Sequence, residues 1–334
     1  MQTFKSLVVT ETSEGNFERH IIQKSFDDLP KNDTLIRVHF AGLNYKDALS
    51  ATGNKGVSKK YPFTPGVDAA GKVVRSSNPS FEPGQSVLVT GYDLGMNTSG
   101  AFAEYICVPS AWVVALPKNL SLAQSMICGT AGFTAALALH KMETNGQTPS
   151  MGNILVTGAT GGVGSMAVLL FSQSGYEVTA STGKAEAKNY LTNLGASEIL
   201  ERSHANDPSE RLALKPRWAG ALDTVGGNTL ATAIKACRPH GNVAATGLVD
   251  TPMLAINVMP FIIRGVNLLG VDSAETPMGL RLKIWDRINL FAQNADFKLK
   301  LEAMAQYVSL EELDSMYINR ILEGKTQGRI VVRL

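Results

Sequence analysis

The most constraining feature of this sequence is a glycine-rich turn near the middle of the chain. An apolar run, Ile154-Leu155-Val156-Thr157, leads directly into Gly158-Ala159-Thr160-Gly161-Gly162-Val163-Gly164, and residues 164–174 can continue as a helix. Glycine lets the backbone turn sharply and approach a pyrophosphate, while the N–H groups at a helix start stabilise negative charge. A lone glycine triplet would also suit an ordinary turn, but strand, turn and helix agree here, so we expect a dinucleotide-binding site.

The sequence around this turn predicts a parallel sheet. Short apolar strands alternate with helix-length segments, at residues 154–157, 178–180, 185–194, 221–224, 228–237 and 243–247. Parallel strands need right-handed crossovers, and the resulting doubly wound sheet places its ligand crevice at the carboxyl ends of the strands. We therefore expect a doubly wound α/β domain.

The first third of the chain has a different pattern. Residues 34–40 alternate in the manner of a strand with two distinct faces. Further short strands are predicted at 87–90, after Pro83-Gly84, and at 103–108, before Pro109. Brief strands separated by glycine and proline turns favour a barrel-like β domain.

The pattern changes again near Leu120 and after Asp272. A capping-box pattern, Ser121 with Gln124, precedes small and apolar residues that suit a helix at 133–140. Beyond Asp272 we expect two helices and a terminal strand, at residues 278–291, 310–322 and 329–334.

These changes divide the 334 residues into three predicted segments. A chain of this length holds about two compact domains. We predict a β-rich domain over residues 1–122, a dinucleotide-binding domain over 123–268, and a tail over 269–334 that returns to the first domain. The fold class is therefore α/β, with a β-barrel domain beside a doubly wound parallel sheet.

Composition argues against several classes of protein. With 31 Lys and Arg against 29 Asp and Glu, the formal charge of +2 gives no strong attraction to nucleic acid or to a membrane surface. No apolar run reaches about 18 residues, and residues 1–10 lack the pattern of a signal peptide. Cys107, Cys128 and Cys237 form no Cys-x-x-Cys pair, which fits a reducing compartment. We expect a cytoplasmic protein that acts on a small molecule.

The end of the next predicted strand bears on the choice of cofactor. An acidic side chain about 20 residues after the turn would bind a free ribose hydroxyl, but this chain has Ala180-Ser181-Thr182-Gly183-Lys184 there. Hydroxyls and a cation suit a ribose phosphate, and no carboxylate repels it. The sequence therefore favours NADPH over NADH, although Lys184 alone could also be a solvated surface lysine.

Several motifs together resemble one family over nearly the whole chain. They are Asn44-Tyr45-Lys46-Asp47, residues 65–71 (PGVDAAG), residues 129–135 (GTAGFTA), the phosphate-binding turn and Gly328-Arg329. This order is similar to that of the medium-chain dehydrogenase/reductase superfamily, in its zinc-free, quinone-oxidoreductase-like branch that is grouped with acrylyl-CoA reductase. The resemblance implies a GroES-like catalytic domain, a Rossmann domain, NADPH as cofactor and a homodimer.

The zinc-dependent alcohol dehydrogenases of that superfamily differ from this chain at their metal ligands. Asn44, Val67 and Thr130 stand where thiolate or imidazole ligands would be needed. Cys128 lies close to Thr130 in the sequence and is the one candidate metal ligand there. Such a cysteine more commonly acts as a small, buried apolar side chain. We expect no metal, and hydrogen bonds in place of a Lewis acid.

The resemblance also implies a set of residues around the cofactor, namely Tyr45, Thr160, Gly161, Gly162, Val163, Ser181, Lys184, Arg202, Leu248, Ser273 and Asn319. Arg202 follows a predicted strand end and could add a second cation to the ribose phosphate, or it could be an ordinary surface arginine. Ser273 and Asn319 could equally well cap local backbone.

For an enzyme without zinc the natural reaction is conjugate reduction, in which hydride adds to an alkene that a carbonyl group polarises. We expect an NADPH-dependent reductase, most specifically of acrylyl-CoA, with quinone reduction and a non-catalytic NADPH-binding sensor as alternatives. Tyr45 is the candidate proton donor, or it only packs against the cofactor. Asp47 and Asp68 are weaker candidates for acid or base, because either could tie down a turn.

Two further expectations concern the substrate. Four cations could meet the phosphates of an acyl-CoA at the rim of the cleft, namely Lys59, Lys60, Arg264 and Arg281. The loop 91–98 could serve as a lid or as a plain connection.

Overall fold

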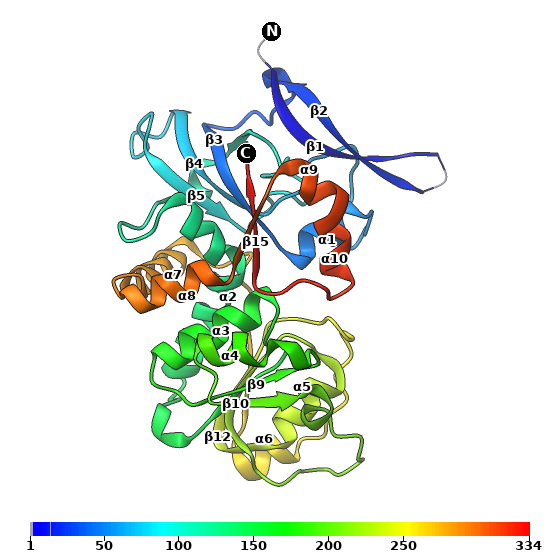
Figure 1. Ribbon diagram of the computed structural model, residues 1–334, viewed down its shortest axis with the longest axis vertical. Coiled ribbons are helices and arrows are strands. Elements are labelled where there is room, and N and C mark those ends of the chain that lie inside the picture. The colour runs from blue at the N-terminus through cyan, green and yellow to red at the C-terminus, as the bar shows by residue number, and fades with distance from the viewer. Residues whose placement is uncertain (1–2, 14) are drawn as a thin grey trace. The chain divides into compact units, whose positions relative to one another are not determined.

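The structure is a computed structural model that describes residues 3–13 and 15–334, and the chain forms two compact units (Figure 1). Unit 1 contains the residues up to Thr130 together with Ala274–Gln293 and Leu301–Leu334. Unit 2 contains Ala131–Ser273 and Asn294–Lys300.

Unit 2 is built on a six-stranded sheet in which every neighbouring pair is parallel. Its strands are β8 (Ile154–Val156), β9 (Val178–Thr182), β10 (Glu198–Glu201), β11 (Trp218–Asp223), β12 (Cys237–Ala245) and β13 (Asn267–Gly270). Its helices are α3 (Gly162–Gln173), α4 (Lys188–Leu194), α5 (Gly227–Lys235) and α6 (Met259–Arg264), with short 3-10 turns η3 (Pro149–Met151), η4 (Ala185–Ala187) and η5 (Arg202–Ala205).

The strand order locates the place where a ligand can bind in unit 2. The order is β10-β9-β8-β11-β12-β13, so the chain winds outward in one direction from β8 and then in the other direction from β11. The carboxyl ends of β8 and β11 flank this topological switch point, where doubly wound sheets bind their ligands. The expected doubly wound α/β fold is confirmed.

The strands of unit 2 form because they are buried on both faces. The residues of β8, β9 and β11 are all buried, as expected for a parallel sheet covered by helices. The predicted helix 228–237 differs from the structure, because α5 ends at Lys235 and Cys237 already begins β12. Strand β13 was not predicted.

Unit 1 contains a seven-stranded sheet and a separate hairpin. The hairpin pairs β1 (Thr3–Glu11) with β2 (Phe17–Ser25), and the sheet has the order β14-β15-β3-β4-β5-β7, with β6 paired to β3. The sheet strands are β3 (Thr34–Leu43), β4 (Asp68–Ser76), β5 (Ser86–Thr90), β6 (Tyr105–Val108), β7 (Val114–Ala115), β14 (Ala305–Val308) and β15 (Arg329–Arg333).

The helices of unit 1 come from both ends of the chain. They are α1 (Tyr45–Ala51), α7 (Met278–Phe291), α9 (Leu310–Glu312) and α10 (Ile318–Leu322), with 3-10 turns η1 (Phe26–Asp28) and η2 (Ser110–Trp112). The predicted helix 278–291 matches α7, whereas the predicted helix 310–322 consists of α9, a π-helical turn (η6, Leu313–Tyr317) and α10.

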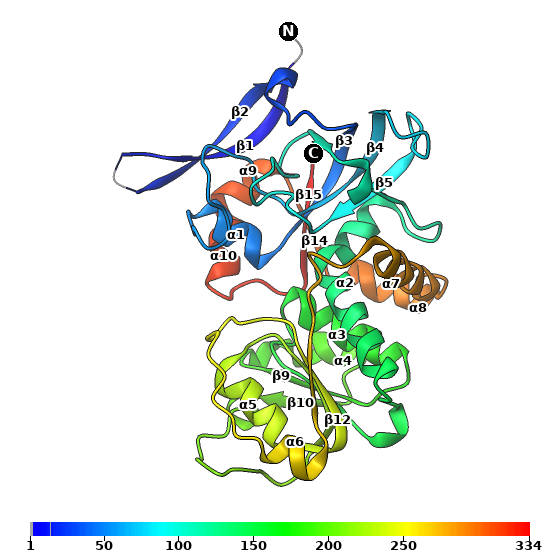
Figure 2. The same ribbon diagram turned by 180° about the vertical axis from the view of Figure 1, so that it is seen from behind.

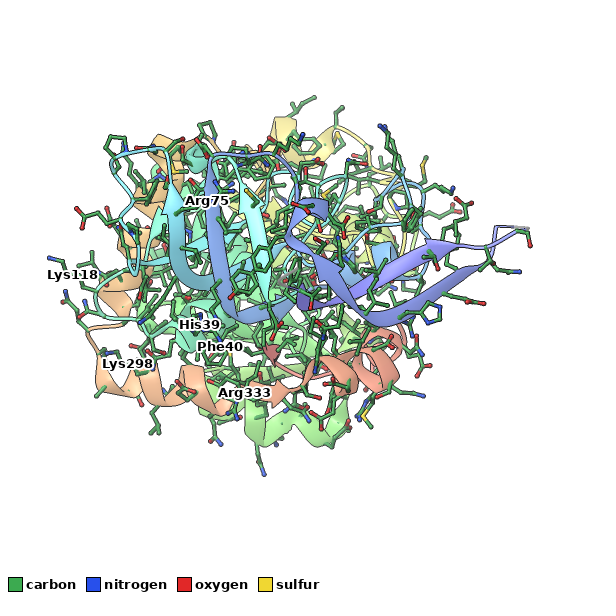
Figure 3. The ribbon with its side chains drawn as sticks, turned by 90° about the horizontal axis from the view of Figure 1, so that it is seen from above. His39, Phe40, Arg75, Lys118, Lys298 and Arg333 are labelled. Atoms are coloured by element: carbon green, nitrogen blue, oxygen red, sulfur yellow. The ribbon has the colours of Figure 1, made fainter. Side chains whose placement is uncertain are left out.

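The last strand joins the sheet of unit 1. Residues of β15 pair antiparallel with β3, and β14 lies beside β15 (Figure 2). Arg333 of β15 stands opposite Phe40 of β3, and Figure 3 shows both near His39. The first and last thirds of the chain thus share one sheet.

Helix α2 (Leu122–Thr144) and helix α8 (Ala295–Ala303) each contain a boundary between the units. The capping box that we predicted before α2 is present, because Gln124 N donates to Ser121 Oγ and Ser121 N donates to Gln124 Oε1. By length and composition α2 could cross a membrane, but 78% of its most apolar window is buried within the protein. That burial is typical of a core helix.

Candidate functional site

The phosphate-binding turn of unit 2 contains two glycines that the fold itself requires. Gly158 has a φ of +56°, and a Cβ at this position would lie 2.2 Å from Thr224 Oγ1. A Cβ at Gly164 would lie 2.3 Å from the carbonyl oxygen of Gly158. These glycines allow the turn to fold tightly between β8 and α3.

Gly161 is different, because no neighbouring protein atom excludes a side chain there. It is the N-cap residue of α3 in an extended conformation, and a Cβ at this position would have Gly158 O as its nearest neighbour, at 3.4 Å. The first N–H groups of a helix have no partner within the helix, and a bare backbone beside them allows an anion to approach. This stretch, Thr160 to Val163, therefore fits a pyrophosphate.

Strand β11 braces the turn at the switch point. Thr157 Oγ1 donates to Asp223 Oδ1 at 2.7 Å, and Thr224 N donates to Thr157 Oγ1 at 3.0 Å. Asp223 Oδ2 also accepts the N–H groups of Val225 and Gly226. Burial raises the pKa of Asp223 above its ordinary value. Sequence reasoning missed Asp223, although an acidic residue at the end of an apolar strand was a visible signal.

The carboxyl ends of β9 and β10 bring together the residues expected at the ribose phosphate. Ser181 and Thr182 are buried at the end of β9, and the half-buried Lys184 donates its backbone N–H to Thr182 Oγ1 at 3.1 Å. Arg202 follows β10, and its guanidinium lies against Gly183. We call the two cations at these neighbouring strand ends the Lys184/Arg202 pair.

Two other expected cofactor residues lie further along the same edge of the sheet. Leu248 follows β12, is 61% exposed, and has its Cα 3.2 Å from a Cβ built at Gly226. Ser273 follows β13 and is half-buried. The sheet therefore places every predicted cofactor residue of unit 2 at or after the carboxyl end of a parallel strand.

The remaining two predicted residues belong to unit 1. Tyr45 is the first residue of α1 and is half-buried, whereas Asn319 lies in α10 and is exposed. Helix α1 packs against α10, so both residues belong to one helix pair.

A buried ionic cluster lies beside the start of α1. It consists of Asp47, Asp68 and Arg329 with Asn44 and Thr130, and its three charged residues are almost fully buried. Asp68 Oδ2 lies 3.5 Å from Arg329 Nη2 and accepts hydrogen bonds of 2.8 Å from Asn44 Nδ2 and Thr130 N. Asp68 Oδ1 accepts the hydroxyl of Thr130 at 2.5 Å. The carboxylate of Asp68 is thus satisfied by an ion pair and three hydrogen bonds.

Arg329 ties several segments of unit 1 together. Its guanidinium donates to the carbonyl oxygens of Ile127 and Leu43 and to Asn44 Oδ1, at 2.9 to 3.1 Å. Burial lowers the pKa of Arg329, and the carboxylates of Asp68 and Asp47 oppose this.

Asp47 fixes the start of α1. Its carboxylate accepts the N–H of Asn44 at 2.8 Å and that of Val67 at 2.8 Å. Burial, with Asp68 nearby, raises the pKa of Asp47 to about 7. The structural alternative that we considered for Asp47 and Asp68 matches these contacts, since both hold backbone groups in place.

Two family models match much of the chain. Residues 30–118 match the model described as "Alcohol dehydrogenase GroES-like domain", and residues 162–281 match the one described as "Zinc-binding dehydrogenase".

Bacterial relatives match over the whole length. YhfP of Bacillus subtilis, which carries the name of a quinone oxidoreductase, is 42% identical over 336 residues, 100% of both chains. The acrylyl-CoA reductase AcuI of Ruegeria pomeroyi is 41% identical over 330 residues, 98% of each chain.

The chain belongs to the medium-chain dehydrogenase/reductase superfamily. Solved structures of relatives agree with the fold. The YhdH oxidoreductase of Salmonella enterica in complex with NADP has a TM-score of 0.94 at 39% identity and covers 99% of each chain. The Bacillus subtilis protein YhfP with NAD bound has a TM-score of 0.94 at 42% identity and covers 100% of each chain. The resemblance inferred from the motifs is confirmed.

This member of the medium-chain superfamily has no good zinc ligand at the positions where its zinc-dependent relatives bind the metal, namely Asn44, Val67 and Thr130. Asn44 and Thr130 are bound to Asp68, and Val67 offers no donor side chain. Burial raises the pKa of the Cys128 thiol to about 12, so its thiolate is unfavourable. Among residues 3–13 and 15–334, no group of three or more His, Cys, Asp or Glu side chains could hold a metal ion. This donor set does not fit tetrahedral zinc.

Four cations were expected to meet the phosphates of an acyl-CoA, and for two of them the structure shows that this expectation is wrong. Arg281 is fully buried, and its guanidinium donates to the carbonyl oxygens of Thr90 and Ala274 and stacks on Tyr92. Arg264 donates to backbone carbonyl oxygens, including that of Lys235 at 2.8 Å. Both arginines serve the fold because backbone oxygens take up their donors.

The other two of these cations remain candidates, since Lys59 and Lys60 are exposed. The loop 91–98 is an ordered turn: Leu94 is fully buried, and Asp93 accepts the side chains of Asn97 and Thr98. These contacts favour the plain connection over a lid.

Proposed function

We propose that this chain is an NADPH-dependent reductase of a small activated alkene, with acrylyl-CoA as the most specific candidate. The observation that carries the proposal is the Lys184/Arg202 pair at the ends of β9 and β10, where no acidic residue follows β9 before Lys184. Two cations at this edge suit the ribose phosphate of NADPH. Similarity to the acrylyl-CoA reductase AcuI supports the substrate, and similarity to YhfP keeps quinones as the second candidate.

NADPH supplies the hydride when it is bound. The residues of this chain hold and orient it: Thr160 to Val163 with the start of α3 bind the pyrophosphate, and Ser181 with the Lys184/Arg202 pair binds the ribose phosphate. The proposed supporting contacts to the rest of the cofactor come from Tyr45, Leu248, Ser273 and Asn319.

The substrate side requires groups that stabilise developing negative charge. When hydride adds to the far carbon of an enoyl thioester, charge builds up on the carbonyl oxygen, and preorganised N–H or O–H donors lower the barrier. A proton must then reach the neighbouring carbon. We assign Tyr45 as donor or proton relay, because its hydroxyl is a weak acid and the buried ionic cluster fixes the start of its helix.

The test is to mix purified protein with NADPH and either acrylyl-CoA or a benzoquinone, and to follow the loss of reduced nicotinamide by absorbance. We expect faster turnover with acrylyl-CoA, and slower turnover when NADH replaces NADPH. Turnover with the benzoquinone but not with acrylyl-CoA would overturn the assignment of acrylyl-CoA as the substrate. Tight NADPH binding without turnover on enoyl thioesters, enals and quinones would support the sensor alternative.

We also propose a homodimer. The edge strand β13 has an open side, and exposed apolar side chains lie on and near it: Leu268 is 39% exposed, Ile263 55% and Ile262 73%. Unpaired strand edges beside apolar side chains favour pairing with a second chain. Light scattering on the purified protein should give twice the monomer mass, and a monomer would contradict the proposal.

The cytoplasm is the proposed location, because the free thiols of Cys107, Cys128 and Cys237 are all buried and suit a reducing compartment. Fluorescence microscopy of a tagged chain can test this location.

We also propose that the domains end at residues 122 and 268. Limited proteolysis with mass spectrometry can locate the cut sites and so test these limits.

A further inference from the structure

Gly183 lies in the middle of the proposed ribose-phosphate site, yet its φ does not require glycine. This φ lies outside the left-handed region, so a side chain there would not meet the strain of a left-handed backbone. A Cβ built at Gly183 would lie 3.1 Å from Cζ, Nε and Nη2 of Arg202, and no other atom is nearer. The atoms that a side chain at Gly183 would meet most closely are therefore those of the Arg202 guanidinium, which would have to shift by a few tenths of an ångström.

The three equal distances show how this guanidinium is oriented. Cζ, Nε and Nη2 share one plane, and they are joined by bonds of about 1.33 Å. A point that is 3.1 Å from all three stands over the face of that plane. One face of the Arg202 guanidinium thus covers Gly183, and its N–H groups point sideways, in the direction from which guanidinium groups bind phosphate.

The sheet register explains why these residues meet. Glu201 of β10 pairs with Thr182 of β9 at the end of a parallel ladder, and Arg202 and Gly183 directly follow the two strands. Arg202 is exposed, so packing around its side chain does not hold it. Contact with the bare backbone at Gly183 is what the structure offers to orient it.

We propose that Gly183 is a specificity-determining position, where the missing side chain seats the Arg202 guanidinium so that it can recognise the phosphate that distinguishes NADPH from NADH. The inference rests on the proposed use of NADPH. Gly183 acts through Arg202 and is therefore a positioning residue. A Cβ at Gly183 tilts or displaces the guanidinium, which costs affinity for NADPH and leaves affinity for NADH unchanged.

The test compares the dissociation constants of NADPH and NADH, measured by calorimetry on the whole protein, for Gly183→Ala, Gly183→Val, Arg202→Ala and the double variant Gly183→Val with Arg202→Ala. Gly279→Ala is the matched control, because a Cβ at Gly279 in α7 meets open space. Thermal unfolding of each variant reports whether the fold is retained.

We expect Arg202→Ala to weaken the binding of NADPH about tenfold, which corresponds to the loss of one charge-assisted hydrogen bond. The affinity for NADH should change less than about twofold. Gly183→Val should lose nearly as much affinity for NADPH as Arg202→Ala, and Gly183→Ala should lose less. The double variant should bind NADPH no more weakly than Arg202→Ala does. Gly279→Ala should bind both cofactors as the parent does.

The outcomes separate this inference from the proposed function. If Arg202→Ala weakens NADPH while Gly183→Val does not, or if the losses multiply in the double variant, the role of Gly183 is wrong and the cofactor assignment stands. If Arg202→Ala leaves the NADPH-to-NADH ratio unchanged, the proposed use of Arg202 fails as well.

Discussion

The two units of this chain use charged side chains in opposite ways. In unit 1 the buried ionic cluster is complete, because Asp68 and Arg329 satisfy each other and the backbone around them. In unit 2 the Lys184/Arg202 pair stands at the ends of two strands, with Arg202 exposed. Charges of the first kind depend on each other, because loss of one leaves the other buried and uncompensated, whereas charges of the second kind are suited to bind an anion from solution.

The largest expected effect comes from opening the buried ionic cluster. Arg329→Met leaves Asp68 buried without its counter-ion, which should lower the free energy of unfolding by about 3–5 kcal/mol. Urea unfolding measures the loss, and Arg75→Ala, an exposed arginine of β4, is the control with an expected change of about 0.5 kcal/mol or less. Equal stability of Arg329→Met and the parent would show that the buried Asp68 does not need Arg329 as its counter-ion.

The second effect is the pH dependence of the same cluster. The pKa of Asp47 is about 7 in the folded protein and near 3.8 in an unfolded chain, so between these values the folded state binds more protons. Stability should therefore fall as pH rises from 4 to 7, by up to about 4 kcal/mol from this group.

Asp47→Asn removes this titration, so its urea midpoint should vary less than that of the parent between pH 5 and pH 8. The comparison is made within each protein, because the substitution also alters the hydrogen bond from Val67. Parallel pH curves for the two proteins would refute the assigned pKa.

A smaller effect is expected at the phosphate-binding turn. Gly161→Ala meets no protein atom closer than 3.4 Å, so the fold should tolerate it, while the added methyl group blocks the pyrophosphate. The affinities for NADPH and NADH should both fall about tenfold or more, with little change in the melting temperature of the protein. Gly164→Ala is the contrast, because its Cβ would lie 2.3 Å from Gly158 O and should lower stability too. Unchanged cofactor affinity in Gly161→Ala would place the pyrophosphate elsewhere.

The smallest expected effect is that of Tyr45→Phe. Loss of the hydroxyl should lower kcat about two- to tenfold and leave the KM for NADPH unchanged, because the ring can still pack. Steady-state kinetics measures both constants, with Tyr307→Phe on β14 as control. If kcat stays the same, Tyr45 only packs and the proton comes from water.

Sequence reasoning performed best where local pattern decides the structure. The strand, glycine turn and helix from Ile154 onward, the capping box at Ser121 and helix α7 all follow from short-range signals, and the structure contains each of them. Fold class followed too, because alternating strands and helices leave few topologies.

The same reasoning failed where burial depends on distant residues. Arg281 and Arg264 look like surface cations in the sequence, but contacts with Thr90 and Lys235 make them structural. The pairing of Asp68 with Arg329 joins positions that are far apart in the sequence, and no periodicity reports it. The hairpin of β1 and β2 was also missed.

The measurement that tests the central claim most directly is a pair of calorimetric titrations with NADPH and NADH, repeated on Lys184→Ala. The account predicts that NADPH binds more tightly, that added salt reduces its advantage because the attraction is between charges, and that Lys184→Ala lowers NADPH affinity while leaving NADH alone. NADH binding as tightly as NADPH in the parent protein would contradict the account.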